Sequence, residues 1–278
     1  MQLGIIGPVS ALRKLKIGTM HLILTSQVLS NKEYVNFYKE RLREGDYVIL
    51  DNDAHEQKAA SSLTLLDEAI KIIRPSEVVL PDVIRNRAET VERTIEGIKH
   101  FRVDNRDRYA DIKLMAVAQG NTVEEWEQCK NQLWALDSIV DYPFDVIGIP
   151  RVYADDFNTW VTAVRRVCDK MPPIEIHLLG SPFNIDSAAE IERHFPTRVR
   201  STDTAKPIHY ALDHTYFEQT MRINAHDKRP IGWLDSTQRN IKSRPQDFFD
   251  VEMSAKQIHI AQTNINRMEW AISADLTQ

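Results

Sequence analysis

Residues 77–82 read Glu-Val-Val-Leu-Pro-Asp, and a helical stretch at Arg87–His100 follows them. The apolar run is rich in Val and Leu and does not alternate with polar residues, which is typical of a strand buried on both faces of a parallel sheet. The stretch after it spaces Val91, Ile95 and Ile98 as on one face of a helix. This segment therefore predicts a β-strand, a carboxylate at its end, and then a helix.

The same unit recurs along the chain. The predicted strands are His21–Leu24, Tyr47–Leu50, Glu77–Leu80, Ile112–Ala118, Phe144–Ile149, Ile174–Leu179 and Arg198–Thr202. The predicted helices between them are Ser62–Ile73, Arg87–His100, Thr122–Leu136, Asp155–Asp169 and Ser187–His194. A spacing of about thirty residues and six or more units predict a (β/α)₈ TIM barrel. A doubly wound open sheet is the alternative, disfavoured because no Gly-rich phosphate loop follows the first strand.

No linker or low-complexity tract divides the chain, so we expect a single domain over residues 1–278. The segment 216–250 is polar and without clear periodicity, which predicts an irregular insertion. An amphipathic helix from about Ser254 to Ile272 closes the chain, with Ile258, Ile265 and Met268 on one stripe.

Composition excludes several classes of protein. The formal net charge of the 278 residues is −5, so any contact with nucleic acid must come from a local basic patch. No apolar run approaches the ~20 residues that cross a bilayer, and the first residues do not resemble a secretory signal. Two isolated cysteines, Cys129 and Cys168, cannot build a Cys-rich zinc site or a disulfide framework. We expect a cytoplasmic protein with neither a membrane partner nor zinc.

Polar residues and glycines end the apolar runs. They are Asp51, Asp82, Gln119 with Gly120, Gly148, Gly180 and Asp203. In a parallel barrel all strands end at the same rim, where active sites are built, so these residues predict a carboxylate-rich mouth. Glycines at such a rim let a flat ligand approach the backbone. The alternative for any one aspartate is that it caps the following helix.

At these positions the chain resembles the tRNA-guanine transglycosylase superfamily, whose members insert 7-deazaguanines into nucleic acid. The segments that carry the resemblance, in chain order, are Val48–Asp51, Leu80–Asp82, Ala118–Gly120, Gly148–Pro150, His177–Gly180 and Val199–Asp203. Each motif is weak alone, and the ordered set is more specific.

The chain departs from the family's motifs at three points, and these differences narrow the set of family members that it resembles. Asn52 and the two residues after it replace the family's Ser-Gly-Gly, Ile149 and Pro150 depart from its Gly-Gly-Leu, and its Cys-x-Cys-x-x-Cys…His zinc site is absent. The chain is also shorter than the tRNA-modifying members. It is most similar to phage-type enzymes that modify DNA in this way, with the tRNA enzymes as the alternative.

The resemblance implies a role for each residue. Asp203 would be the nucleophile at C1′, as in retaining glycosidases, and Asp51 the general acid and base. Asp82 would accept hydrogen bonds from N1–H and the exocyclic amine of guanine. Gln119 and the backbone of Gly148 would contact O6 or the 7-substituent. Asn52, Gly120, Ile149 and Gly180 complete the predicted substrate-binding set.

The implied partners are DNA, or alternatively tRNA, and a free 7-deazaguanine base, without a resident cofactor. The target nucleotide must leave the helix stack, so a basic patch should surround the mouth. The residues predicted for it are Arg222, Lys228, Arg229, Arg239, Lys242 and Arg244. No metal is assigned: His177 lies in an apolar strand, and His209 and His214 lack a ligand pattern. The family often dimerises, so a homodimer stays open.

Two other classes of function remain. Asp51 and Asp203 could serve a carbohydrate-active barrel acting on small molecules. An aldolase-type barrel would need a lysine on a strand to form a Schiff base, and the only candidate, Lys113, is at the wrong end of its strand. A barrel that binds nucleic acid without catalysis is the other alternative.

Overall fold

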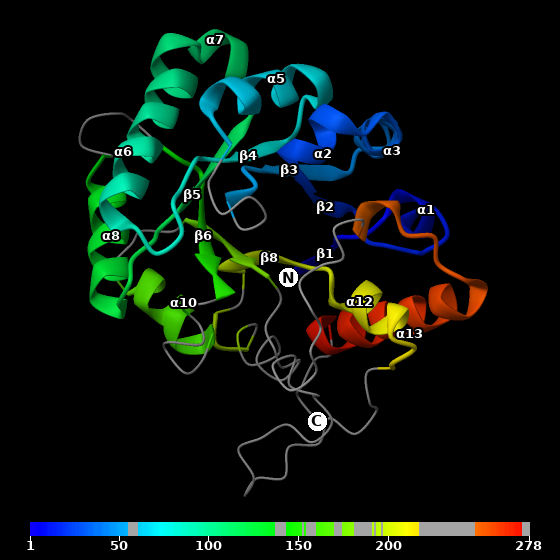
Figure 1. Ribbon diagram of the computed structural model, residues 1–278. Helices are drawn as coiled ribbons and strands as arrows, with labels where there is room; N and C mark the ends of the chain where they lie inside the picture. The colour runs from blue at the N-terminus through cyan, green and yellow to red at the C-terminus, as the bar shows by residue number, and fades with distance from the viewer. Residues whose placement is uncertain are drawn as a thin grey trace, which may run out of the picture.

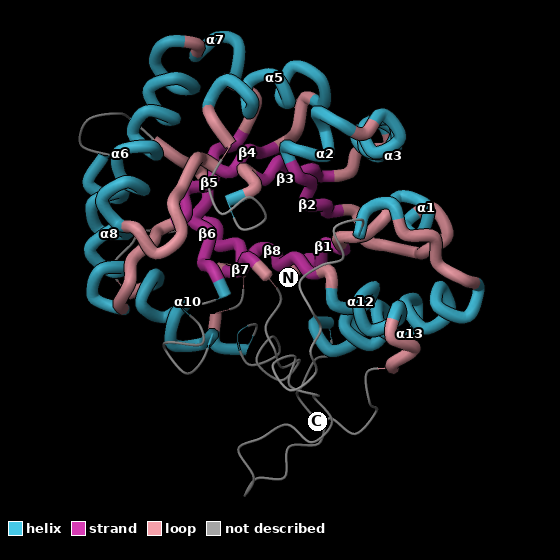
Figure 2. Tube along the Cα trace, viewed as in Figure 1, coloured by secondary structure: helices cyan, strands magenta, loops and turns pink. Residues whose placement is uncertain are grey.

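The computed structural model describes residues 1–54, 61–136, 143–151, 153, 160–169, 174–180, 191, 193–195, 197–216 and 248–273. Its eight strands are β1 (Gln2–Ile5), β2 (Met20–Leu24), β3 (Tyr47–Asp51), β4 (Glu77–Val79), β5 (Lys113–Val117), β6 (Val146–Pro150), β7 (Glu175–Leu179) and β8 (Val199–Thr204). All the pairings between them are parallel, in the order β1-β8-β7-β6-β5-β4-β3-β2. The strands form a nearly closed ring with helices outside it, a (β/α)₈ TIM barrel (Figure 2).

The barrel closes where β1 meets β2. These two strands are the edges of the hydrogen-bonded sheet, and Gly4 of β1 faces Met20 of β2. A Cβ on Gly4 would lie 3.1 Å from Cε of Met20, so the glycine gives the methionine room to fill the seam. Side-chain packing therefore completes the ring.

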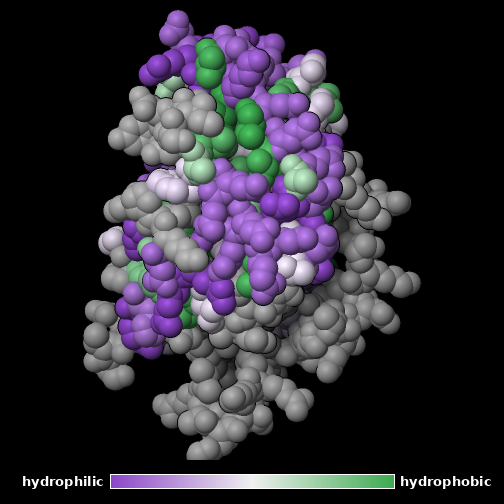
Figure 3. Space-filling model, turned by 90° about the vertical axis from the view of Figure 1, so that its left-hand side faces the viewer, coloured by the Kyte–Doolittle hydropathy of each residue, from purple (hydrophilic) through white to green (hydrophobic). Residues whose placement is uncertain are grey.

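Helices follow most strands and cover the outside of the barrel (Figure 1). They are α1 (Val9–Leu12), α2 (Thr25–Ser30), α3 (Lys32–Arg43), α5 (Leu63–Ile73), α6 (Arg87–Ile98), α7 (Arg106–Tyr109), α8 (Val123–Ala135), α10 (Trp160–Cys168), α12 (Lys206–Leu212) and α13 (Ala255–Ser273). A π-helix, η1 (Lys99–Asp104), continues α6, and η3 (Phe248–Asp250) is a 3₁₀-helix. On the face that carries α6 and α8, hydrophilic side chains predominate (Figure 3).

Side-chain caps explain where several helices begin. Asn31, Ser62, Asn86 and Thr122 each accept a hydrogen bond from a backbone N–H in the first turn of α3, α5, α6 and α8. These residue types are preferred at helix N-caps because their side-chain oxygens satisfy backbone donors that lack an intrahelical partner. The start expected near Thr122 is confirmed.

The sequence predicts most of this architecture. Its seven strands and the helices at α5, α6, α8, α10 and α13 are confirmed where the structure describes them. It misses β1 and the helices α1 to α3. Two predicted strand ends are wrong: β6 runs on to Pro150 and β8 to Thr204, so Asp203 lies within its strand, and Gly148, expected to end an apolar run, lies in the middle of β6. Of the segment 216–250, the structure describes only Tyr216 and η3.

Candidate functional site

Side chains from four strands meet inside the barrel near its amino-terminal end. Nη1 of Arg200 lies 2.7 Å from Oε2 of Glu77 and 3.0 Å from Oε2 of Glu175. Oη of Tyr47 donates to the same oxygen of Glu77 at 2.6 Å. Because β3 and β4 lie across the barrel from β7 and β8, their side chains can meet only in the barrel interior. Alternation along β3 then puts Asp51, four residues after Tyr47, on the inner face at the carboxyl end.

Asp203 lies on the inner face of β8 and is held by the neighbouring strand. Its Oδ1 is 3.1 Å from Nε2 of His177 and accepts a 3.0 Å hydrogen bond from the backbone N–H of Gly180. The other ring nitrogen of His177 is 2.8 Å from Oγ of Ser201. All three side chains are buried. His177 is thus a buried, hydrogen-bonded histidine in the apolar strand, and one of its partners is the carboxylate of Asp203.

A second cluster joins the ends of β3, β4 and β5. Nδ2 of Asn52 donates to Oδ1 of Asp82 and to the carbonyl of Leu80, both at 2.7 Å. Oδ1 of Asn52 accepts from the N–H of Ala54 at 2.9 Å. Nε2 of Gln119 donates to Oδ2 of Asp82 at 2.5 Å. Two of the polar residues predicted for substrate binding therefore donate to the third, Asp82, and all three are buried.

The amide of Gln119 has one orientation only. Its Oε1 accepts a 3.1 Å hydrogen bond from the backbone N–H of Arg85, and the hydroxyl oxygen of Tyr153 also lies 3.1 Å from it. Because Arg85 offers a donor and the carboxylate of Asp82 offers only acceptors, the amide oxygen must face Arg85 and the NH₂ group must face Asp82. One N–H of that group is used by Asp82, and the second is the remaining donor of the side chain.

Burial raises the pKa of the Asp82 carboxyl to about 6, and the hydrogen bonds from Asn52 and Gln119 oppose that rise. The group is thus ionised at neutral pH and takes up a proton in mildly acidic solution. Burial also raises the pKa of the Cys129 thiol to about 11, so the sulfur, which accepts from the N–H of Gln119, stays a thiol. Cys129 is thus a small buried residue with a free thiol.

The predicted glycines and Ile149 have different surroundings from those expected. A Cβ on Gly120 would lie 2.5 Å from the backbone N of Trp126, so this glycine admits the first turn of α8. A Cβ on Gly148 would lie 2.9 Å from side-chain atoms of Met115 and Val117, so this glycine makes room for these two side chains. Alternation puts the Ile149 side chain on the outer face of β6, away from the barrel interior.

Gly180 is needed for its backbone conformation. Its φ is +72°, in the left-handed region that favours glycine, and this conformation directs its N–H to Asp203. The glycine therefore acts at the predicted site, through a hydrogen bond to the carboxylate.

The predicted nucleic-acid-binding residues, Arg222, Lys228, Arg229, Arg239, Lys242 and Arg244, lie outside the described residues. Within the described part of the chain, no group of three His, Cys, Asp or Glu side chains is arranged to hold a metal ion. His209 of α12 stacks on Phe248 with ring centroids 4.6 Å apart. No helix among the described residues could span a bilayer.

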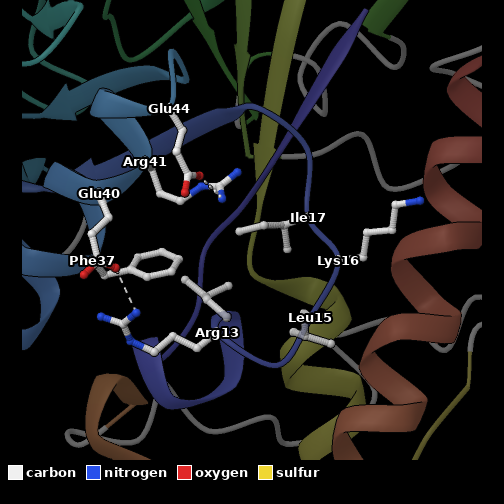
Figure 4. Close-up of a pocket in the computed structure, with 9 residues that line it drawn as sticks. Arg13, Leu15, Lys16, Ile17, Phe37, Glu40, Arg41 and Glu44 are labelled. Carbon is white, nitrogen blue, oxygen red and sulfur yellow. Dashed lines mark hydrogen bonds and ion pairs between the residues drawn. The ribbon is translucent and has the colours of Figure 1, made fainter.

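A pocket of about 370 Å³ lies elsewhere on the barrel, between α1 and α3 (Figure 4). Leu12, Ile17 and Phe37 form part of its wall, and Arg13 pairs with Glu40 across it at 3.0 Å. The chain near Ile17 leads into the amino end of β2. The pocket is thus near the opposite end of the barrel from Asp82 and Asp203, and it contains no predicted site residue.

Sequence reasoning missed Tyr153 and Ser201. The hydroxyl of Tyr153 accepts from the N–H of Gly120 at 2.7 Å and lies 2.6 Å from its carbonyl oxygen, so it fixes the Gln119-Gly120 segment. Nothing in the local sequence marks Tyr153, which follows β6 and contacts residues more than thirty positions away. Ser201 could have been found, because it stands two residues before Asp203 on the same face of a strand.

No protein-family model matches the chain, and no curated protein has a significant sequence match to it. The candidate site therefore stands on its own geometry. It comprises the carboxylate of Asp203 held by His177 and Gly180, the cluster of Asn52, Asp82 and Gln119, and Asp51 on the inner face of β3.

Proposed function

We propose that the protein is a base-exchange transferase that replaces guanine in DNA by a 7-deazaguanine, through a covalent bond between Asp203 and C1′ of the nucleotide. One observation carries the proposal. Asn52, Asp82 and Gln119, all in the predicted substrate-binding set, come from three different strand ends, and Asn52 and Gln119 each donate a hydrogen bond to the carboxylate of Asp82. The carboxyl end of a TIM barrel is also where enzymes of this fold bind their substrates.

The chemistry requires two displacements at C1′. In the first, an oxygen of Asp203 forms a bond to C1′ while the bond from C1′ to N9 of guanine breaks, and the electron pair leaves with the base. Asp51 supplies a proton to the departing guanine. In the second, Asp51 takes the proton from N9 of the deazapurine, N9 bonds to C1′, and the bond to Asp203 breaks. Two inversions retain the anomeric configuration, as in retaining glycosidases.

Base recognition fits the hydrogen-bonding capacity of the second cluster. Each oxygen of Asp82 takes one amide hydrogen bond and keeps a lone pair for N1–H and the exocyclic amine of guanine. The second N–H of Gln119 is a donor for O6. Adenine presents an acceptor at N1 and a donor at C6, so it would meet like groups at both positions.

The test is incorporation of labelled 7-cyano-7-deazaguanine into duplex DNA by the full chain, with tRNA in a parallel reaction. We expect label in DNA from the wild-type protein and none from the Asp203→Ala variant. Label in tRNA alone would overturn the DNA assignment. Label in neither nucleic acid would overturn base exchange.

A further inference from the structure

A chain of polar side chains, partly buried at Arg200 and buried beyond it, runs up the inside of the barrel and ends at Asp203. Nε of Arg200 donates to Oγ of Ser201 at 3.2 Å, and that oxygen is 2.8 Å from Nδ1 of His177. Nε2 of His177 is 3.1 Å from Oδ1 of Asp203. Arg200 is itself anchored by the carboxylate of Glu77. The chain therefore connects the ionic network at the amino end of the strands with the candidate nucleophile.

The donors and acceptors along this chain are consistent with hydrogen bonds that all point from Arg200 toward Asp203. A guanidinium can only donate, so Oγ of Ser201 accepts from Arg200. An ionised carboxylate can only accept, so Nε2 of His177 must carry a proton toward Asp203. In the neutral imidazole Nδ1 then accepts, and the hydroxyl hydrogen of Ser201 points to it. With the proton on Nδ1 alone, lone pairs of Nε2 and Oδ1 would face each other.

The two oxygens of Asp203 are consequently unequal. Oδ1 accepts from both His177 and the N–H of Gly180. No described residue donates to Oδ2, which keeps its lone pairs for an electrophile. The two donors also stop the carboxylate from rotating, so Oδ2 has a fixed direction.

We propose that His177 is a positioning residue for base exchange: its Nε2–H, with the N–H of Gly180, holds Oδ1 of Asp203 so that Oδ2 attacks C1′. Ser201 keeps the imidazole in the required tautomer. This inference rests on the proposed function, and it adds a residue that acts through Asp203 without touching the substrate.

Two substitutions separate this role from simple packing. In His177→Gln the amide N–H can reach the place of imidazole Nε2, whereas in His177→Asn the shorter amide reaches only the place of Nδ1. We expect His177→Asn to lower kcat by about 100-fold, with KM for DNA within about threefold of wild type. His177→Gln should recover at least about tenfold of that loss. His259→Asn, at an exposed position on α13, is the matched control and should leave both constants unchanged.

Equal kcat values for His177→Gln and His177→Asn, or a loss confined to KM, would overturn the positioning role while leaving base exchange intact. If His177→Asn does not fold, Ser201→Ala is used in its place. We expect Ser201→Ala to lower kcat by less than His177→Asn would. An unchanged kcat in Ser201→Ala would overturn the role of the hydrogen-bonded chain.

¹⁵N NMR of the histidine-labelled wild-type protein provides a readout that needs no activity. We expect His177 to be protonated at Nε2 and unprotonated at Nδ1. An Nε2 without a proton would overturn the inference. If the wild-type protein exchanges no base, the proposed function is wrong, and this spectrum alone decides whether His177 donates to Asp203.

Discussion

Nε2 of Gln119 donates to Oδ2 of Asp82 at 2.5 Å, and the oxygen of the same amide accepts from the backbone N–H of Arg85, so the contact cannot reverse. A buried carboxylate is thereby paired with a neutral group whose polarity is fixed. The arrangement leaves Asp82 as an acceptor and Gln119 as a donor toward any ligand at the mouth. The candidate site thus has a defined hydrogen-bonding pattern without a bound ligand.

Gln119→Glu tests this polarity. The change sets a second carboxyl against Asp82 in a buried place, and each carboxylate raises the pKa of the other. We expect the free energy of unfolding to fall by about 2–3 kcal/mol at pH 8 and by clearly less at pH 5, where a protonated carboxyl can donate again. Urea unfolding at both pH values measures it. Gln132→Glu on the exposed face of α8, next to Arg87, is the control and should cost nothing. An equal loss at both pH values would contradict the argument.

The pKa of Asp82 predicts how base exchange depends on pH. In the proposed function the carboxylate must be ionised to accept two hydrogen bonds from guanine, and burial raises its pKa to about 6. As the pH falls through about 6 the group takes up a proton, so kcat/KM should decrease by up to about tenfold per pH unit. The pH profile of label incorporation measures this.

Asp82→Asn serves as the control for that profile, because it has no titrating group at this position. Its activity should be low and should lack the step near pH 6. A step that persists in the variant would assign the titration to another group.

Much of the barrel could be predicted from local patterns, and its exceptions have physical causes. Strands β3 to β7 are apolar because helices and the barrel interior cover both faces. β1 could not be predicted from its local sequence, because its four residues include Gln2 and Gly4. Its place in the sheet depends on pairing with β8, nearly two hundred positions away. Glu77 is the first residue of a predicted strand, and the sequence does not indicate that it is buried and paired with Arg200. Such long-range ion pairs leave no local signal.

Part of the candidate site was also predictable, because parallel strands end at the same rim of the barrel. Asp82 and Gln119 stand at strand ends, so the parallel topology alone brings them to one rim. The role of Gly120 was not predictable, because the atom that excludes a side chain there belongs to Trp126 of the following helix. Likewise, the hydrogen bond from His177 to Asp203 depends on the register of β7 against β8, which includes a bulge between Ile176 and His177.

Asp203→Ala tests the nucleophile separately from the fold. Without the carboxylate no covalent bond to C1′ can form, so incorporation of label should fall by at least about 1000-fold. A denaturing gel should also lose the protein–DNA adduct that accumulates when the deazapurine is withheld. Asp213→Ala, exposed just after α12, is the matched control. A persistent adduct in Asp203→Ala would exclude this residue as the nucleophile.

Arg200→Met tests the ionic network below the site. The change leaves the carboxylate of Glu77 buried without its cation, which costs about 3–5 kcal/mol of the free energy of unfolding. The double variant with Glu77→Gln should recover much of that loss because it removes the stranded charge. Lys113→Met, which breaks a half-exposed pair with Glu175, should cost less than about 1 kcal/mol. Similar losses for Arg200→Met and Lys113→Met would show that burial does not control the cost.

The lowered pKa of His21 predicts that the free energy of unfolding decreases in acid. It is buried on β2, its Nε2 is 2.7 Å from Oδ2 of Asp46, and burial lowers its pKa despite that partner. The unfolded chain therefore binds a proton near pH 6.5 before the folded chain does. The free energy of unfolding should then decrease as the pH falls below about 6.5, by at most about 1.4 kcal/mol per pH unit. Asp82 contributes with the opposite sign, because its pKa is raised and the folded protein gains stability as it takes up that proton.

Comparison of variants isolates the contribution of His21 from that of Asp82. His21→Gln keeps a donor for Asp46 but cannot titrate, so its stability should decrease less than that of the wild type between pH 7 and pH 5. His259→Gln, exposed on α13, should follow the wild-type curve. The measurement is urea unfolding across this range. Parallel curves for His21→Gln and the wild type would mean that His21 binds its proton equally in both states, and another group would then have to account for any acid sensitivity.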